Sequence, residues 1–148
     1  MLSLVLPSIH ADSLVRMLNN IFEMTVGDIE LILFCPDNVL AYANVLAPFP
    51  IRIKFRKEVE CLGSSGAQAK AVKYVSPNTD FVMALSDDIV LLGKGWDEII
   101  LENFVRRERV VGSDLFCLGP RMSWGGVNVM FGKAYPTLPL MRKSSIDR

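Results

Sequence analysis

The sequence predicts an α/β fold in which a mostly parallel sheet is covered by helices on both faces. Short apolar runs alternate along the chain with segments of helical periodicity, and parallel strands need crossover connections that are usually helices. The chain has 148 residues, of which 51% are hydrophobic and 22% charged, which suits one domain with one core. We therefore expect residues 1–148 to form a single three-layer α/β/α domain of Rossmann-like topology.

Five short apolar runs are the predicted strands of this sheet. They cover residues 2–6, 29–34, 51–55, 81–85 and 115–118. After Gly119 the pattern weakens into two adjacent glycines and a tail interrupted by prolines. We expect that tail to be irregular.

Four helices are predicted between and after these strands, because apolar residues recur there at helical spacing. They cover residues 14–22, 39–47, 66–75 and about 96–107. Asp12 or Ser13 can cap the first helix, and Ser64 or Ser65 the third. Pro48 follows the second helix and is expected to end it.

Composition excludes several classes of protein. Sixteen basic and sixteen acidic residues give a net charge of +0 and a pI of about 6.6, so the charge excess of a nucleic-acid-binding protein is missing. No window approaches the ~20 apolar residues of a membrane span, and no signal-peptide pattern opens the chain. Three cysteines and a single histidine form neither a zinc spacing nor a disulfide framework. We expect a cytoplasmic protein without a transmembrane segment and with reduced thiols.

The sharpest chemical feature is a pair of carboxylates, Asp87 and Asp88, at the end of the apolar run 81–85. Ligands of open α/β sheets bind beyond the carboxyl ends of the strands. Two adjacent negative charges repel and are costly to desolvate, so a partner is expected. Mg²⁺ or Mn²⁺ that bridges to the phosphates of a nucleotide is one such partner. The alternative is that one aspartate caps a turn or the next helix while the other is solvated.

Other loops offer weaker polar groups. The sole histidine, His10, follows the first apolar run, and a polar residue that lines the loop is its simplest interpretation. The Gly-Ser-Ser-Gly segment at 63–66 precedes the third predicted helix, where backbone N–H groups can face an anion or simply form a capped loop. Asp37 follows the second run.

Four segments together follow the order of motifs of a known family. They are the strand and Pro7-Ser8 of residues 2–8, the apolar strand, acidic motif and Gly-Trp of residues 80–96, the triplet Gly119-Pro120-Arg121, and Trp124-Gly125-Gly126 with the apolar residues to Phe131. In this order the chain resembles the nucleotide-sugar-binding part of the family 2 glycosyltransferases, which have the GT-A fold. The resemblance implies a core over residues 2–119 and an acceptor-side segment and tail over residues 120–148.

The resemblance also implies a ligand and a set of roles. The expected donor is a nucleoside-diphosphate sugar, and a UDP-sugar or GDP-sugar is the first choice. The expected cofactor is Mn²⁺ or Mg²⁺. Asp88 would ligate the metal, Ser86 holds the first motif position, and Asp87 would lie at the donor sugar as a binding and catalytic residue. The other donor-side residues would be Pro7, Ser8, His10, Asp37, Gly66 and Lys70. The acceptor side would hold Trp124, Gly125 and Gly126.

The chain departs from the family in its acceptor half. The family's acidic residue that activates the acceptor lies beyond the Gly-Gly strand, whereas the acidic residues here after Glu108 are Asp114 and Asp147. Asp147 is the candidate base, and no clear counterpart of the family's base is present.

Three functions therefore stay open. The first is a small glycosyltransferase-like domain that transfers a sugar to an unidentified acceptor. The second is a non-catalytic GT-A domain that serves as a binding or assembly module. The third is a phosphoribosyltransferase-like enzyme, because an apolar strand that ends in Asp-Asp also occurs at diphosphate sites there. The apolar tail residues Tyr135, Leu138, Leu140 and Met141 either cover this domain or contact a second copy.

Overall fold

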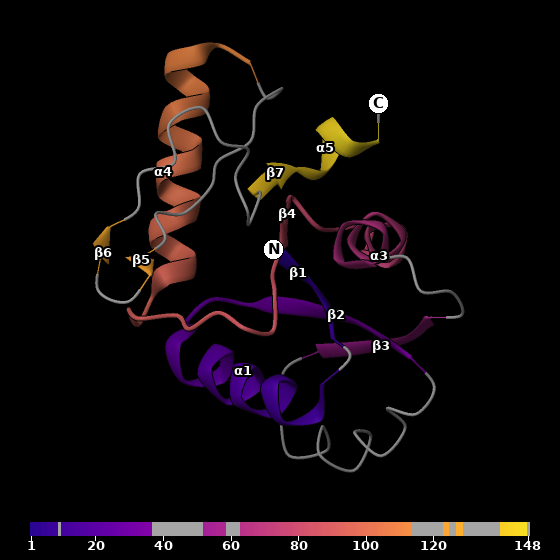
Figure 1. Cartoon of the computed structure of the whole chain (residues 1–148). Coiled ribbons are helices and arrows are strands. Elements are labelled where there is room, and N and C mark those ends of the chain that lie inside the picture. Colours follow the sequence, from indigo (N-terminus) through magenta and orange to yellow (C-terminus); the bar gives the residue numbers. More distant parts are fainter. Residues whose placement is uncertain are drawn as a thin grey trace.

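The computed structural model describes residues 1–8, 10–36, 52–58, 63–113, 123–124, 127–128 and 140–147. Five strands in this part of the chain form one sheet, in the order β3-β2-β1-β4-β7 (Figure 1). Their bounds are β1 (Leu2–Pro7), β2 (Ile29–Pro36), β3 (Arg52–Glu58), β4 (Phe81–Ala84) and β7 (Leu140–Arg142). The first four are parallel to one another, and β7 pairs antiparallel with β4. The predicted α/β class with a mostly parallel sheet is confirmed.

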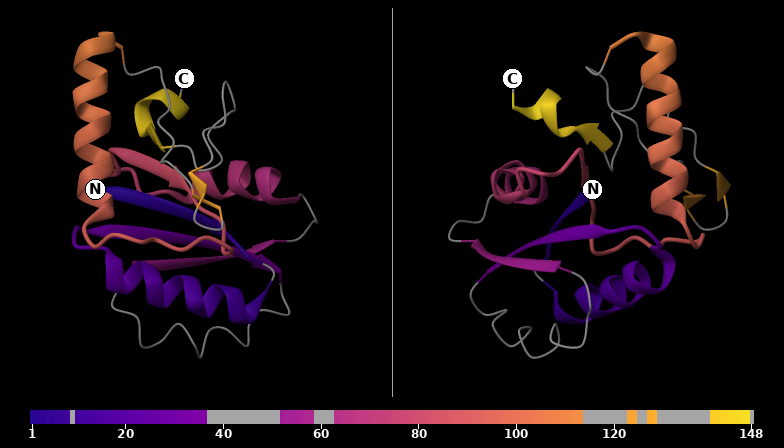
Figure 2. Two further views of the ribbon diagram at one scale, coloured as in Figure 1. Left: turned by 60° about the vertical axis from the view of Figure 1, so that its left-hand side comes forward. Right: turned by 180° about the vertical axis from the view of Figure 1, so that it is seen from behind.

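Helices cover both faces of the sheet, as Figure 2 shows for α1 and α3. The helical elements are α1 (Ala11–Met24), α3 (Gly63–Ala71), the 3₁₀ turn η2 (Val72–Tyr74), α4 (Trp96–Val111) and α5 (Lys143–Ile146), and a two-stranded ladder joins β5 (Ser123–Trp124) to β6 (Val127–Asn128). The helix predicted at 39–47 and the strand predicted at 115–118 lie outside the described residues.

The predicted helix caps were wrong. Helix α1 begins at Ala11, so Asp12 lies in its first turn, and His10 holds the N-cap position without a side-chain hydrogen bond. Helix α3 begins at Gly63, which puts Ser64 and Ser65 inside it. The chain reaches α4 through Gly95 in a left-handed conformation (φ 76°), which glycine adopts at little cost. That turn lets the helix start directly at Trp96.

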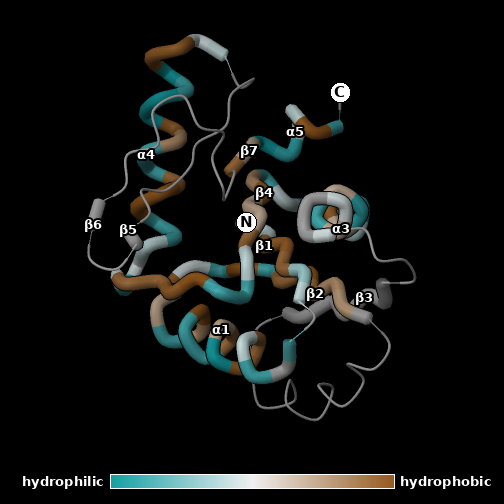
Figure 3. Tube along the Cα trace, viewed as in Figure 1, coloured by the Kyte–Doolittle hydropathy of each residue, from teal (hydrophilic) through white to brown (hydrophobic). Residues whose placement is uncertain are grey.

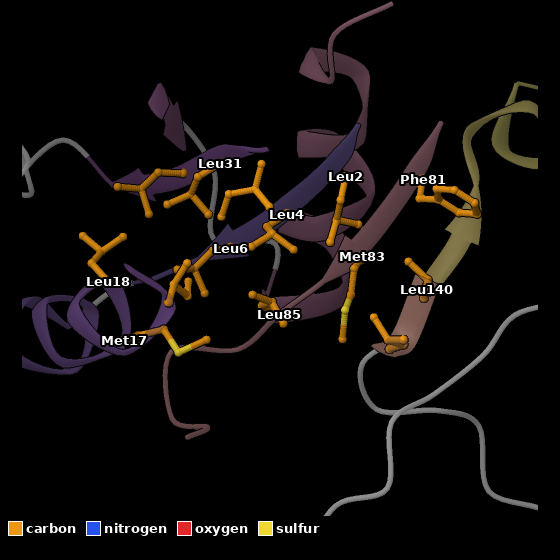
Figure 4. Close-up of a cluster of buried hydrophobic side chains, with 14 of the residues drawn as sticks. Leu2, Leu4, Leu6, Met17, Leu18, Leu31, Phe81, Met83, Leu85 and Leu140 are labelled. Atoms are coloured by element: carbon orange, nitrogen blue, oxygen red, sulfur yellow. The ribbon is translucent and has the colours of Figure 1, made fainter. Parts of the chain in front are cut away.

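Alternation along the central strand divides the core into two clusters. Leu2, Leu4 and Leu6 of β1 are buried on one face in a cluster with residues of α1 and α4. Figure 4 shows these leucines together with Met17 and Leu18 of α1. Val5 points to the other face and packs with residues of α3. The hydropathy trace of Figure 3 shows the matching pattern on α1, where apolar and polar residues alternate along the helix. A strand buried on both faces is what a sheet between two helical layers requires.

The end of the chain is more ordered than the sequence predicts. The Arg142 guanidinium binds the Glu108 carboxylate of α4 through two hydrogen bonds of 2.7 Å each. It also lies 4.3 Å from the centre of the Phe81 ring, which stacks edge-on against Phe104. Leu140 is fully buried. Leu140 therefore covers this domain, and Met141 is half-buried in the same strand. Tyr135 and Leu138 lie outside the described residues.

None of the described helices is long and apolar enough to cross a membrane.

Candidate functional site

The carboxyl ends of β1, β2 and β4 meet at one edge of the sheet. The backbone N–H of Ser8, just after β1, donates to the carbonyl of Phe34 in β2 at 3.1 Å. The N–H of Leu85, just after β4, donates to the carbonyl of Val5 at 2.8 Å. Strand pairing therefore continues into both loops, and it brings Ser8 next to the segment that carries the two carboxylates.

Ser8 and Asp87 are joined directly. The Ser8 hydroxyl donates a hydrogen bond to Oδ2 of Asp87, and the backbone N–H of His10 lies 3.4 Å from the same hydroxyl oxygen. The Ser8 side chain is buried, whereas Asp87 is half-buried and His10 is exposed. A buried hydroxyl at the end of β1 thus fixes the orientation of the first carboxylate.

The second carboxylate faces solvent. Asp88 is exposed, and its Oδ1 accepts a hydrogen bond from the hydroxyl of Ser86. Its Oδ2 has no hydrogen-bond partner within the described part of the chain. The loop therefore presents one oriented carboxylate outward and holds the other inward against β1.

Helix α3 also contacts the chain at this end of the strands. Gln68 of α3 donates from Nε2 to the carbonyl of Leu85 at 3.1 Å. Leu85 immediately precedes residues 86–90, the loop that carries Asp87 and Asp88 and is called the acidic loop below. Gly66 and Lys70 lie on the same helix, Gly66 half-buried and Lys70 exposed. Pro7 is the last residue of β1, which ends here, and Gly66 and Lys70 lie in α3, which follows β3 in the chain.

The donor set at this edge is suited to a hard divalent cation. Asp87, Asp88, Ser86 and Ser8 offer carboxylate and hydroxyl oxygens, which Mg²⁺ and Mn²⁺ prefer. Among the described residues no cluster of three or more His, Cys, Asp or Glu side chains could hold a metal ion. An ion here would take most of its ligands from water and phosphate, as Mg²⁺ commonly does.

Asp147 is not brought to this site. Its carboxylate pairs with Lys143, whose backbone N–H donates to the carbonyl of Asp80 at 2.9 Å. Asp80 precedes β4, whereas Asp87 and Asp88 follow that strand. Asp147 therefore lies near the amino end of β4, whereas the acidic pair follows the carboxyl end of the same strand. Of the remaining candidates, Trp124 lies in β5, and Asp37, Gly125 and Gly126 are outside the described residues.

Two side chains that sequence reasoning missed hold the chain beyond the acidic loop. Asn20 of α1 accepts from the N–H of Leu91 at 2.6 Å and donates to the carbonyl of Leu91 at 3.1 Å. Asp97 of α4 is buried and accepts from the N–H groups of Val26 and Gly27 at 3.2 and 2.7 Å. The local sequence holds no signal for either, because each partner is about 70 residues away in the chain.

Comparison with solved structures gives neighbours that cover nearly the whole chain. S. aureus TarS 1–349 in complex with UDP-GlcNAc matches 97% of this chain at a TM-score of 0.67 and 15% identity, and S. aureus TarS at 0.70 and 16%. The 4-diphosphocytidyl-2C-methyl-D-erythritolsynthase from Anaerococcus prevotii matches 97% of this chain at a TM-score of 0.59 and 10% identity.

The match covers only part of these proteins. The chain spans 45% of TarS 1–349 and 28% of the TarS chain, against 70% of the Anaerococcus prevotii enzyme. Neither a protein-family model nor a curated protein matches the sequence. At these identities the likeness concerns the fold, and it agrees with the resemblance that the motifs carry. The chain therefore has an α/β fold like that of TarS, in agreement with the GT-A fold that the sequence predicts.

Proposed function

We propose that this chain is a glycosyltransferase-like domain that binds a nucleoside-diphosphate sugar through a divalent metal ion at Asp88. One observation carries the proposal. An exposed carboxylate, oriented by Ser86, follows the buried strand β4 at the carboxyl edge of the sheet. This is the edge at which open α/β sheets bind their ligands. Neighbours of the same fold were solved with UDP-GlcNAc and with UDP, which supports a nucleotide sugar as the ligand.

In this proposal each group has a separate task. Asp88 holds Mn²⁺ or Mg²⁺, and the metal supplies positive charge against the diphosphate that departs in the transfer. Asp87, held by Ser8, faces the donor sugar. The nucleoside lies against the loops after β1 and β2, where Pro7, Ser8, His10 and Asp37 stand in the sequence. The proposal assigns Gly66 and Lys70 of α3 to the diphosphate, and Trp124, Gly125 and Gly126 to the acceptor.

One observation favours a second candidate, a domain that binds the donor without turning it over. Sugar transfer needs a base that removes the proton of the acceptor hydroxyl. Asp147 is paired with Lys143 near the amino end of β4, at the opposite end of the strands from the acidic pair, so it is too distant to be this base. If another part of the chain or a partner supplies this base, the domain can transfer the sugar. If no base is supplied, the domain binds the donor without transferring its sugar.

A thermal-shift panel tests the proposal. UDP, GDP, CDP and dTDP are each added with Mn²⁺ or with EDTA, to wild type and to Asp88→Ala. A nucleotide at about 100 times its Kd stabilises the folded state by about 2.7 kcal/mol, which raises the Tm of a domain of this size by about 5–10 °C. We expect such a shift for one nucleotide with Mn²⁺, little shift with EDTA, and none for Asp88→Ala with either.

Glu102→Ala is the matched control, because Glu102 is an exposed carboxylate on α4, away from the acidic loop. It should shift as wild type does. A wild type that no nucleotide stabilises in the presence of Mn²⁺ contradicts the proposal, and stabilisation by phosphoribosyl diphosphate instead would favour the third function. Release of nucleoside diphosphate from the matching sugar nucleotide then distinguishes a transferase or hydrolase from a binding module.

A further inference from the structure

We propose that Asn20 of α1 is a positioning residue for the acidic loop, because it fixes the backbone of Leu91 and thereby the position of the Asp88 carboxylate. The inference rests on the proposed function of Asp88. Asn20 lies on a different element from every residue assigned above to the donor or the metal. Its side chain acts on the acidic loop through the backbone rather than by touching a ligand.

The first step of the argument is the geometry at Leu91. The Asn20 side chain accepts the Leu91 N–H at 2.6 Å and returns its own N–H to the Leu91 carbonyl at 3.1 Å. A carboxamide that pairs with both polar groups of one residue imitates the backbone of a neighbouring strand. Asn20 is half-buried, so water competes less for these hydrogen bonds than it would at an exposed site. The pair therefore fixes Leu91 in position and in orientation.

The second step is that the loop is also held at its other end. Leu85 is tied to Val5 by its N–H and to Gln68 by its carbonyl, and Asp87 is tied to Ser8. Between Asp87 and Leu91 the chain is more exposed, with Asp88 and Val90 facing solvent. The exposed part of the loop is thus short. The side chains of Ile89 and Leu91 pack against the first core cluster, and Asn20 adds the hydrogen bonds that hold the Leu91 backbone.

The third step is that α1 itself is firmly placed. Gly95 donates its N–H to the carbonyl of Met24 at 2.8 Å, and the Trp96 indole donates to the hydroxyl of Thr25 at 3.1 Å. Asp97 receives the N–H groups of Val26 and Gly27. The end of α1 and the start of α4 therefore form a fixed support, from which Asn20 reaches back to the loop. Groups that orient a metal ligand typically change metal affinity by 10–100-fold when they are removed.

The test compares Asn20→Ala with Asn19→Ala. Asn19 is exposed on the same helix, so both changes gain the same helix propensity and only one removes the contacts with Leu91. Mn²⁺ affinity is titrated by the loss of the free-ion EPR signal, with Mn²⁺ alone and with Mn²⁺ plus each of UDP, GDP, CDP and dTDP, at a temperature where every variant is folded. We expect Asn20→Ala to weaken Mn²⁺ binding in the presence of UDP by about 10-fold or more, and Asn19→Ala to equal wild type.

Two further measurements separate positioning from a general loss of stability. Asn20→Asp keeps the acceptor for the Leu91 N–H but puts a carboxylate oxygen against the Leu91 carbonyl in place of the donor, so its Mn²⁺ affinity should also fall below that of wild type. Hydrogen exchange of the peptide that contains Leu91 should be faster in Asn20→Ala than in Asn19→Ala.

The outcomes distinguish the two proposals. If wild type binds Mn²⁺ with UDP through Asp88 but Asn20→Ala binds as tightly as Asn19→Ala, the positioning role is contradicted and the proposed function stands. If wild type binds no Mn²⁺ in the presence of any of the four nucleotides, the proposed function fails, and the role of Asn20 toward a metal fails with it. Equal exchange at Leu91 in both variants would contradict the anchor itself.

Discussion

At the scale of single residues, Gly27 shows how closely the support of the acidic loop is packed. A Cβ atom at this position would lie 2.7 Å from Oδ2 of the buried Asp97, closer than unbonded atoms can approach without a shift. Gly27→Ala should therefore lower the free energy of unfolding by about 1–3 kcal/mol. Urea denaturation followed by circular dichroism measures the change.

Gly93→Ala is the control for this substitution, because a Cβ there would meet nothing within 4 Å. It should change the free energy of unfolding by less than about 1 kcal/mol, and it can even stabilise by restricting the unfolded chain. Equal effects of the two substitutions would show that backbone entropy, and not the contact with Asp97, decides the result.

Residues were predictable from the sequence where their signal is local. Asp87 and Asp88 adjoin a continuous apolar strand, so their place at the carboxyl edge follows from the pattern alone. Asn20 and Asp97 depend on partners about 70 residues away. Asn20 then looks like any polar helix residue, and Asp97 like an acid that favours a helix N-terminus. Only the folded chain brings them to Leu91 and Gly27.

At the scale of elements, the ion pair between Arg142 and Glu108 joins β7 to α4. Both side chains are mostly shielded, with exposed fractions of 27% and 21%, and the guanidinium binds through two nitrogens. Such a geometry is stronger than an ordinary surface pair. A double-mutant cycle with Arg142→Ala and Glu108→Ala should give a coupling energy of about 1–3 kcal/mol in urea denaturation.

The pair Lys143 and Asp147 offers the comparison within the same chain. It spans one turn of α5, and Asp147 is 59% exposed, so solvent screens the attraction. The corresponding cycle should give a coupling energy below about 0.5 kcal/mol. If the two cycles gave equal values, shielding and bidentate geometry would not be what makes the first pair strong.

Elements were predictable where they bury apolar residues periodically, as β1, β2, β4, α1 and α4 do. Strand β7 was missed because it has only three residues, and one of them is the arginine of the ion pair. Its pairing with β4 and its contact with α4 come from distant parts of the chain. Local propensity therefore had no means of separating this strand from an irregular tail.

At the scale of the whole molecule, the sheet depends on β7 to cover one side of β4. A chain that ends at residue 139 would lose the buried Leu140 and the bonds of Arg142, and β4 would become an edge strand with an apolar sequence. Such edges pair with other chains. We expect this variant to aggregate or unfold below the Tm of the full chain, in size-exclusion chromatography and a thermal scan.

A chain that ends at residue 142 keeps β7 and lacks α5, whose Ile146 is half-buried against the second core cluster. It should remain monodisperse with a modestly lower Tm. Aggregation of both variants alike would assign the effect to α5 rather than to the edge of β4. Self-association of the full chain stays a prediction of the sequence.

The place of β7 in the sheet has a consequence for how the protein is made. Met83 of β4 pairs with Leu140 of β7, so one side of β4 stays unpaired until the ribosome has synthesised β7. At about 5–20 residues per second, more than fifty intervening residues take roughly 3–10 s to appear. Throughout that interval β4 can pair with β1 but has an open flank. A nascent chain of this protein is thus open to misassembly between the synthesis of β4 and that of β7, and slow codons in that interval would lengthen the exposure.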